Sequence, residues 1–272
     1  MANLRLGVIG AGGRMGQAVI QQIKHSAGVV LVAACDRPGS EVIGQDAGEV
    51  AGVGRSGIEI GDSPENVFDT VESVIEFSSP ESSIKNALRA ADRGGVHVIG
   101  TTGLSISEEE ILAKAGEKAR LVYAPNMSVA VNILFAITRQ VASILDDDFD
   151  IEILEMHHRN KVDAPSGTAL GLGRAAAKGR EVDFGPKAVL SREGQTGQRN
   201  RGDIGFATLR GGDVTGDHTV VFAATGERLE LSHKASSRTI FSRGAVRAAR
   251  WAQDQAPGVY TMADVLGLTE YS

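Results

Sequence analysis

The sequence predicts an α/β protein of two domains, and three observations support that prediction. At 272 residues the chain is longer than one average domain of about 150 residues. Aromatic residues make up only 4% of it, so the core must be aliphatic, as in helices packed on a buried sheet. Short apolar runs alternate with helical patterns as far as residue 127, and more closely spaced runs follow.

The first domain is predicted from strands that alternate with helices. A strand at 4–9 runs into a glycine turn, a helix covers 17–25, and an apolar strand follows at 29–35. The later elements are a strand at 71–77, a helix at 80–93, a strand at 96–99, a helix at 107–118 in which Ser107 and Glu110 resemble a capping box, and a strand at 121–124. Such alternation predicts a parallel sheet covered by helices on both faces.

The second domain is predicted from a change of pattern after residue 127. The expected elements are a helix at 128–145, a strand at 151–156, a helix at 166–178, and strands at 207–210, 218–224 and 229–233. Gly-rich turns join the last three strands closely, which predicts a mostly antiparallel open sheet in an α+β domain. Helical spacing returns at Thr239, so the first domain is expected to span 1–127 and 239–272 and the second 128–238.

Charge and cysteine content exclude several classes of partner. The net charge of -6 argues against a nucleic-acid partner, since a DNA-binding protein usually carries a basic excess. The single cysteine, Cys35, allows no intramolecular disulfide and no Cys-rich zinc site. No apolar run is long enough to cross a membrane and no secretory leader is visible, so we expect a cytoplasmic protein. The acidic run 146–148 is interpreted as a solvated helix end.

The turn at 10–16 has the position and composition of a dinucleotide-binding motif. Its glycines would let the backbone approach a pyrophosphate at a helix N-terminus, which predicts a Rossmann-like domain. Asp36, at the end of the second strand, could accept the ribose hydroxyls of NAD. Arg14 and Arg37 could pair with the 2′-phosphate of NADP, so we expect use of either cofactor. The alternative is a glycine turn without a ligand.

The segment 155–169 holds the densest set of reactive side chains. His157, His158 and Lys161 can carry protons or bind anions near neutral pH. Ser166 is a natural N-cap, which would leave the N–H groups of residues 167 and 168 for a carboxylate. A metal site is not expected, because no nearby Cys or third His has ligand spacing. The remaining histidines, which have no local partner set, are interpreted as structural: His25, His97, His218 and His233.

Five segments together resemble the dihydrodipicolinate reductase family (4-hydroxy-tetrahydrodipicolinate reductase) of lysine and diaminopimelate biosynthesis. They are residues 10–16, 100–103, 124–128, 155–169 and 233–238, in the family's order and spacing. The long His-His-Lys segment is very specific, whereas the glycine turn alone would not be. Met127 departs from the family, which often has Phe there, and this puts in doubt only the packing against the nicotinamide.

The resemblance implies an activity and a set of site residues. It implies hydride transfer from NADH or NADPH to C4 of a cyclic dicarboxylate, with a proton to C3 and net loss of water. His157 is implied as proton donor and acceptor, and Lys161 as the second proton donor. The implied substrate-binding residues are His158, Lys161, Ser166, Gly167 and Thr168. The implied cofactor-binding residues are Gly10, Ala11, Gly12, Gly13, Arg14, Met15, Asp36, Arg37, Gly100, Thr101, Thr102, Ala124, Pro125, Asn126 and Met127.

The resemblance also implies a homotetramer built through the sheet of the second domain. The sequence is also compatible with two other functions: another two-domain NAD(P)-dependent dehydrogenase acting on an amino acid or semialdehyde, and a non-enzymatic nucleotide-sensing module. A sensor would need the glycine turn but would have no need of His157 together with Lys161.

Overall fold

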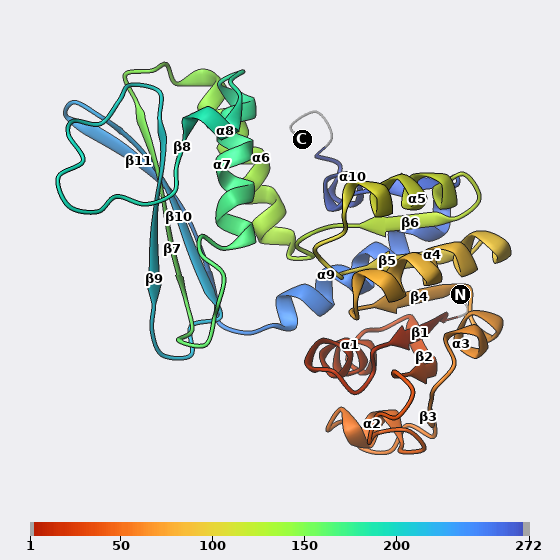
Figure 1. The fold of residues 1–272 in the computed structure, drawn as a ribbon. Helices are drawn as coiled ribbons and strands as arrows, with labels where there is room; N and C mark the ends of the chain where they lie inside the picture. The colour runs from red at the N-terminus through yellow and green to blue at the C-terminus, as the bar shows by residue number, and fades with distance from the viewer. Residues whose placement is uncertain (1–2, 269–272) are drawn as a thin grey trace. The chain divides into compact units, whose positions relative to one another are not determined.

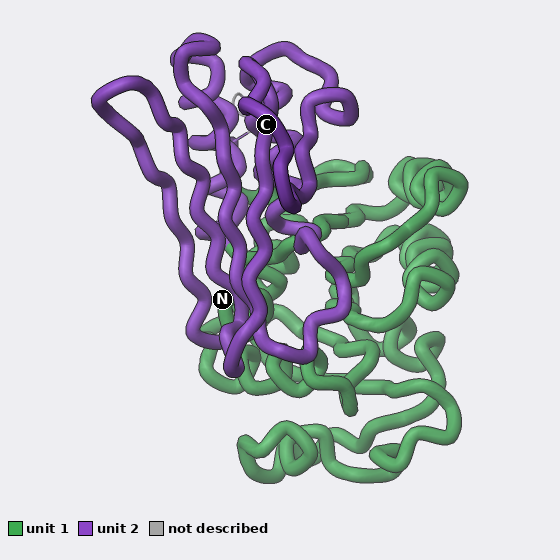
Figure 2. The backbone as a smooth tube through the Cα atoms, turned by 60° about the vertical axis from the view of Figure 1, so that its left-hand side comes forward, with its two compact units in different colours: residues 1–128, 238–266 green, residues 129–237, 267–272 purple. Residues whose placement is uncertain are grey.

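The computed structural model describes residues 3–268, which form two compact units (Figure 2). Unit 1 comprises Met1–Ser128 and Arg238–Leu266, and unit 2 comprises Val129–Ser237 with the short tail from Gly267. The ends of the predicted first domain, residues 1–2 and 269–272, lie outside the described residues. Between residues 3 and 268 no helix is long and apolar enough to cross a membrane.

A seven-stranded sheet forms the centre of unit 1, in the order β12-β6-β5-β4-β1-β2-β3 (Figure 1). Every neighbouring pair is parallel, so the predicted parallel, Rossmann-like sheet is confirmed. Its strands are β1 (Leu4–Ile9), β2 (Val29–Cys35), β3 (Ile60–Gly61), β4 (Ser73–Glu76), β5 (Val96–Ile99), β6 (Arg120–Tyr123) and β12 (Gly258–Tyr260). The strand order reverses between β1 and β4, which is where open α/β sheets bind ligands.

Helices of unit 1 contact the sheet in two groups (Figure 1). One group pairs α1 (Arg14–Lys24) with α9 (Thr239–Trp251), and the other joins α3 (Pro64–Thr70), α4 (Pro80–Arg93) and α5 (Ile106–Gly116). The short elements α2 (Ala47–Val50), η1 (Ala252–Asp254) and α10 (Met262–Leu266) complete the unit. Because α1 and α9 are far apart in sequence, the first unit depends on both ends of the chain.

The predicted capping box at the start of α5 is two residues out of place. Ser105, not Ser107, is the N-cap: its hydroxyl accepts from the Glu108 backbone N–H, and the Glu108 carboxylate accepts from the Ser105 N–H at 2.7 Å. Both serines lie three residues before a glutamate, so sequence spacing alone could not choose between them.

Unit 2 contains a five-stranded sheet in the order β11-β10-β7-β9-β8. Its strands are β7 (Asp150–His157), β8 (Ala188–Val189), β9 (Ile204–Arg210), β10 (Gly216–Ala224) and β11 (Glu227–Ala235). The sheet is mixed rather than mostly antiparallel, because β10 pairs antiparallel with β7 and β11 while β9 pairs parallel with β7 and β8. The short 211–215 connection suggested that β9 and β10 would pair, but β7 lies between them, so only the β10–β11 hairpin follows the prediction.

Two helices cover one face of this sheet. α6 (Val129–Ile144) and α7 (Gly167–Gly179) pack on each other, and the short α8 (Phe184–Lys187) contacts α7. The side chains of β7 alternate, so that Ile151, Ile153, Glu155 and His157 are buried. In the described part of unit 2 no helix covers the opposite face (Figure 1), where Leu154 and Leu209 are 45% and 49% exposed.

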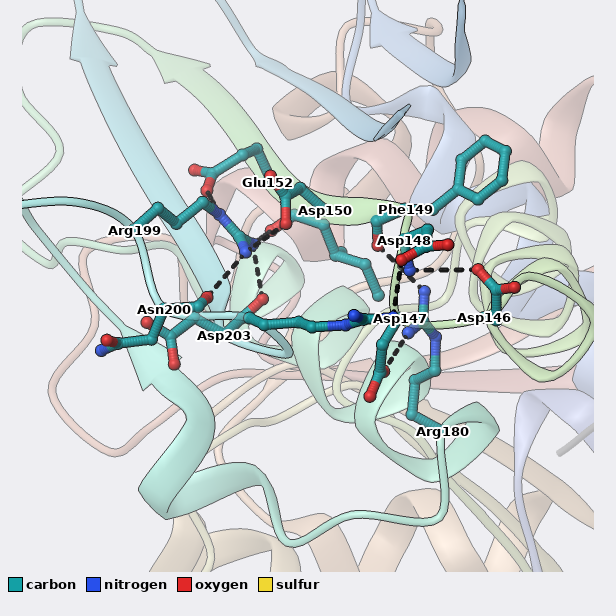
Figure 3. Close-up of polar contacts among 12 residues, drawn as sticks. Asp146, Asp147, Asp148, Phe149, Asp150, Glu152, Arg180, Arg199, Asn200 and Asp203 are labelled. Carbon is teal, nitrogen blue, oxygen red and sulfur yellow. Dashed lines mark hydrogen bonds and ion pairs between the residues drawn. The ribbon is translucent and has the colours of Figure 1, made fainter. Parts of the chain in front are cut away.

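Arginine–carboxylate pairs tie the irregular segment 190–203 to the sheet of unit 2. Arg199 contributes most, because it binds Asp150 at 2.6 Å and Glu152 at 2.9 Å and also donates to three backbone carbonyls (Figure 3). Arg192 and Arg201 bind Glu152 and Asp148. Each aspartate of the run 146–148 therefore has a partner. Asp147 binds Arg180, Asp148 binds Arg201, and the Asp146 carboxylate accepts from the Asp148 N–H.

Candidate active site

The glycine turn at 10–16 follows β1, and its backbone lies so close to neighbouring backbone that Gly10 and Gly16 have no room for a side chain. The N–H groups of Gly10 and Ala11 both donate to the Cys35 carbonyl at 3.0 Å. Gly10 has φ +81°, and a Cβ there would lie 2.6 Å from the Phe77 carbonyl oxygen. A Cβ at Gly16 would lie 2.0 Å from the Gly10 carbonyl oxygen, so the turn and α1 touch through bare backbone.

The start of α1 is left without a side-chain cap. Its N-cap residue is Gly13, and among residues 3–268 no side-chain cap hydrogen bond is made to this helix start. An uncapped helix start next to a glycine turn has both the donors and the dipole that an anion requires. Asp36 fixes the turn from β2, since its carboxylate accepts from the Gly12 N–H at 2.6 Å and from the Arg37 N–H at 2.7 Å.

A pocket of about 750 Å³ opens beside this turn at the switch point of the sheet. Gly10, Gly13, Asp36 and Arg37, four of the residues expected from the sequence to bind the cofactor, line this pocket. Its other lining residues come from the ends of β1, β2 and β4 and from the 62–65 and 77–89 segments: Ile9, Cys35, Pro38, Asp62, Pro64, Glu65, Phe77, Ser78, Ser79, Glu81, Ser82, Lys85 and Arg89. Burial raises the pKa of the Cys35 thiol to about 12, so this cysteine stays protonated.

The segment after β5 adjoins the segment after β4. A Cβ at Gly100 would lie 2.0 Å from the Phe77 ring, and the Gly100 N–H donates to the Glu76 carbonyl at 2.9 Å. Thr101 is buried, and its hydroxyl accepts from the Ser78 N–H at 3.0 Å. Thr101 therefore holds the neighbouring segment with its side chain, whereas Thr102 is exposed.

The segment after β6 continues along the same edge of the sheet. The Ala124 N–H lies 3.5 Å from the Ile99 carbonyl, and Pro125 is exposed. Asn126 accepts from the Ser128 N–H at 2.8 Å. Met127 is only 1% exposed, and its carbonyl packs against Gly244, where a Cβ would lie 1.7 Å from the Met127 oxygen.

A fully buried Glu76–His97 pair supports these segments. His97 Nε2 lies 2.7 Å from the Glu76 carboxylate, which also accepts from Ser78, Ser82 and Asn86. Burial raises the pKa of Glu76, but these partners outweigh it and hold the pKa below its ordinary value. His97 was interpreted as structural from the sequence, and Glu76 was missed because its partner is 21 residues away along the chain.

In unit 2, His157 lies at the end of β7 and is 8% exposed. Its Nδ1 is 2.5 Å from the Glu155 carboxylate, which is two residues earlier on the same face of the strand. Its ring meets the edge of the His218 ring with centroids 5.1 Å apart. A Cβ at Gly216 would lie 2.9 Å from His157 Nε2, so only glycine leaves that side of the ring uncrowded.

His158 and Lys161 lie in the loop that follows. The backbone N–H of His158 donates to Val214 at 2.7 Å, and that of Lys161 donates to the His158 carbonyl. The Lys161 ammonium donates to Asp163 at 2.8 Å. Lys161 thus has an exposed carboxylate partner that a bound anion could replace.

α7 begins at the position that the sequence predicted. Ser166 is its N-cap, and the Ser166 hydroxyl accepts from the Ala169 N–H at 3.1 Å. In the described part of the chain no heavy atom outside the local backbone lies within 4 Å of a Cβ built at Gly167, so the space beside this first turn is open. Thr168 follows in the same turn and is half-buried.

No sequence motif assigns a role to Glu155 or Arg210 in this region, and His218 was interpreted as structural. Arg210, on β9, binds both oxygens of Glu155 at 2.8 and 3.1 Å. His218, on β10, lies 3.0 Å from the Ser166 hydroxyl, and burial lowers its pKa to about 4. The spacing of Glu155 and His157 on one strand was a usable signal, but their partners on β9 and β10 were not visible from spacing.

Comparisons with known proteins agree along the whole chain. Residues 4–127 match the family described as "Dihydrodipicolinate reductase, N-terminus" and residues 130–266 match "Dihydrodipicolinate reductase, C-terminus". The chain is 54% identical to 4-hydroxy-tetrahydrodipicolinate reductase of Afipia carboxidovorans over 272 residues, covering all of both proteins. It is 52% identical to the enzyme of that name from Rhodopseudomonas palustris (strain BisB5), again covering all of both.

Solved structures share the fold at low sequence identity. Dipicolinate-bound dihydrodipicolinate reductase from Paenisporosarcina sp. TG-14 has a TM-score of 0.74 and 20% identity, over 96% of this chain and 98% of that one. An amine dehydrogenase from Mycobacterium smegmatis has a TM-score of 0.60 and 13% identity, over 96% and 95% of the two chains.

Proposed function

This chain belongs to the dihydrodipicolinate reductase family, and from that membership we infer that it reduces 4-hydroxy-tetrahydrodipicolinate to tetrahydrodipicolinate with NADH or NADPH. The reaction delivers hydride to C4 and a proton to C3 with net loss of water, and it belongs to lysine and diaminopimelate biosynthesis. The two other functions considered from the sequence, a different dehydrogenase and a nucleotide sensor, are set aside by the family match.

The observation that carries our assignment of the substrate site is a buried imidazole, His157, in the same unit as an open helix start at Gly167. A cyclic dicarboxylate requires several converging donors for its two anionic groups. His158, Lys161, Ser166, Gly167 and Thr168 are the residues we propose for this role. Lys161 would exchange Asp163 for a substrate carboxylate, which is a charge-for-charge replacement.

We assign the cofactor to unit 1 because the residues there fit a dinucleotide. The positions of Gly10 and Gly16 have no room for a Cβ, and the N-cap Gly13 leaves the first turn of α1 without a side-chain partner. Backbone groups of Ala11, Gly12, Arg14 and Met15 would border the pyrophosphate, and Asp36 and Arg37 the ribose. The nicotinamide would lie along Gly100, Thr101, Thr102 and the 124–127 segment.

The chain's own residues supply protons and orientation. Hydride is what the nicotinamide cofactor provides when bound. His157 holds a proton on its imidazole for delivery to C3, and Lys161 supplies the second proton to the departing hydroxyl, which leaves as water. The substrate carboxylates are held at the α7 start, which fixes the ring for both transfers.

Further proposals concern organisation. We propose residues 1–127 and 239–272 as the dinucleotide-binding domain and 128–238 as the substrate-binding and oligomerisation domain. The uncovered sheet face with Leu154 and Leu209 supports a homotetramer, because an exposed apolar patch on a sheet invites pairing with another copy. Light scattering at four times the chain mass would support it. The buried free thiol of Cys35 supports a cytoplasmic location.

A direct assay tests the proposed function. Purified protein is mixed with NADH or NADPH and freshly generated 4-hydroxy-tetrahydrodipicolinate, and the nicotinamide absorbance is followed. We expect oxidation of both cofactors. No oxidation of either would refute the activity.

Two variants test the proposed roles of His157 and Lys161. His157→Ala and Lys161→Ala should each lower turnover by about 10²–10⁴-fold, as loss of a general acid does, while NADH affinity stays nearly intact. The exposed His25→Ala and Lys118→Ala serve as controls and should behave like the wild type. Loss of NADH affinity in either test variant would show that the substituted residue acts on the cofactor rather than on the substrate.

A further inference from the structure

Glu155 is nearly inaccessible to solvent and accepts hydrogen bonds from four residues. It is 2% exposed on β7. One carboxylate oxygen lies 2.5 Å from His157 Nδ1 and 2.8 Å from Arg210 Nη1. The other accepts from the Ser166 N–H at 3.0 Å, from Arg210 Nη2 at 3.1 Å and from the Thr208 hydroxyl at 3.4 Å.

These contacts keep Glu155 ionised inside the protein. Burial raises the pKa of Glu155, but the hydrogen bonds from His157 and Arg210 outweigh burial and lower the pKa to about 2. An ionised carboxylate can only accept hydrogen bonds, so His157 Nδ1 must carry a hydrogen. The second ring nitrogen, Nε2, is then the one that can take up and release a proton, and it lies beside Gly216, where any Cβ would come within 2.9 Å of it.

Glu155 also reaches the other elements proposed for substrate binding. Through Ser166 it holds the residue that begins α7. Through Arg210, whose Nη2 donates to the Asp163 carbonyl at 2.7 Å, it is connected to the loop that carries Lys161. One carboxylate therefore links the imidazole, the helix start and the lysine loop.

The neighbouring His218 does not compete for this role. The Ser166 hydroxyl already accepts from Ala169, so its hydrogen is free to be donated to His218 Nε2 at 3.0 Å. That arrangement requires a neutral His218. The site thus contains one imidazole paired with a carboxylate and one paired with a hydroxyl.

We propose that Glu155 is a positioning residue that fixes His157 in the Nδ1–H tautomer and thereby dedicates Nε2 to proton transfer. The inference rests on the proposed function only in giving His157 the proton. In Glu155→Gln the Ser166 N–H and Arg210 Nη2 both require an acceptor at the Oε1 position, so the amide oxygen would lie there and the NH₂ would face His157 Nδ1 and Arg210 Nη1. His157 would then have to accept at Nδ1 and carry its hydrogen on Nε2, which is the wrong tautomer for proton transfer.

The first test reads the tautomer in the free protein, without substrate. Histidine ¹⁵N spectra are recorded at a pH where the His157 ring is neutral, with its signal assigned by its loss in His157→Asn. We expect Nδ1–H in the wild type and Nε2–H in Glu155→Gln. A wild-type Nε2–H tautomer, or an unchanged tautomer in Glu155→Gln, would overturn the proposal. A failure of the reductase assay would refute the function while leaving this result standing.

The second test measures turnover in matched variants. Glu155→Gln should lower kcat at least about 100-fold, with the NADH dissociation constant within about twofold of the wild type. Glu155→Asp keeps the charge and should recover kcat to within about tenfold of the wild type. Glu152→Gln is the control, because Glu152 lies on the same strand and binds two arginines but faces away from His157. It should keep both tautomer and kcat.

The outcomes separate positioning from a merely structural role. Equal losses in the Gln and Asp variants, or wild-type turnover in Glu155→Gln, would overturn the proposal. If Glu155→Gln fails to fold, as judged by circular dichroism, the wild-type tautomer and the Asp variant still decide it.

Discussion

Replacing Gly16 by alanine should damage both the stability of unit 1 and cofactor binding. The added Cβ would lie 2.0 Å from the Gly10 carbonyl oxygen and 2.7 Å from the Gly10 carbonyl carbon. Both are backbone atoms, so no side chain can rotate away, and α1 must withdraw from the turn by more than about 1 Å to reach van der Waals contact. That movement displaces the first-turn N–H groups of α1 relative to the glycine turn.

The magnitude follows from the cost of overpacking. Forced backbone shifts of this kind cost about 1–3 kcal/mol, which for a unit of this size corresponds to roughly 2–12 °C in Tm. We expect NADH affinity to fall at least about tenfold, because the pyrophosphate would lose aligned donors. Thermal unfolding by circular dichroism and titration of NADH fluorescence measure the two effects.

Gly13→Ala is the matched control for stability. Gly13 has φ -73°, and its Cβ would lie 3.3 Å from the Gly10 carbonyl oxygen, a gap that a shift of a few tenths of an ångström relieves. Its Tm should stay within about 2 °C of the wild type. The reasoning is refuted if Gly16→Ala keeps the wild-type Tm. A lowered Tm with unchanged NADH affinity would instead refute the assignment of the turn to the cofactor.

Three further predictions concern buried and surface charges. Glu76→Ala strands His97 in the core and should lower the free energy of unfolding by about 3–5 kcal/mol in urea titrations; a loss below 1 kcal/mol would contradict this. Arg199→Met removes ion pairs with Asp150 and Glu152 that contribute about 1–2 kcal/mol. Local opening of the 190–203 segment should therefore become more frequent, and glutamyl endopeptidase should cut it about 5–30 times faster. The exposed Arg228→Met is the control and should leave the rate unchanged. The pKa of Glu155 is lowered from 4.5 to about 2, so its stabilisation is complete above pH 4.5 and lost as the pH falls through 2. The difference in unfolding free energy between wild type and Glu155→Gln should therefore shrink by about 2 kcal/mol from pH 6 to pH 3, and a constant difference would count against it.

The regular parts of the fold were predictable because their signals are local. Apolar runs and helical spacing indicated β1, α1, β2, α4, β5 and α7 to within a few residues. The elements that were missed are short: α2, β3 and α8 have between two and four residues, and the longest, α3, has seven, which is too few to show a clear period. The pairing of β9 with β7 was missed because it joins strands about fifty residues apart, and only tertiary packing decides which neighbour a strand takes.

The site residues also divide into those in local sequence motifs and those brought together only by the fold. The glycine turn, Ser166 and the His-His-Lys segment are sequence motifs and could be recognised as such. Arg210 lies 55 residues from Glu155, and His218 lies 52 residues from Ser166, so their contacts arise only when β9 and β10 flank β7. A buried carboxylate next to a histidine on one strand face was the only local hint of this network.

The discontinuous course of unit 1 has a consequence for how the chain is made. The segment 129–237 leaves the ribosome whole, whereas the parallel sheet of unit 1 still lacks β12 and the helix α9 that lies against α1. The inserted unit can therefore reach its final fold first, while the sheet face of unit 1 that α9 later covers is still exposed to solvent. Release of the last thirty or so residues is the event that completes the cofactor-binding half, so a chain stopped near residue 237 should be captured by chaperones through unit 1 rather than through unit 2.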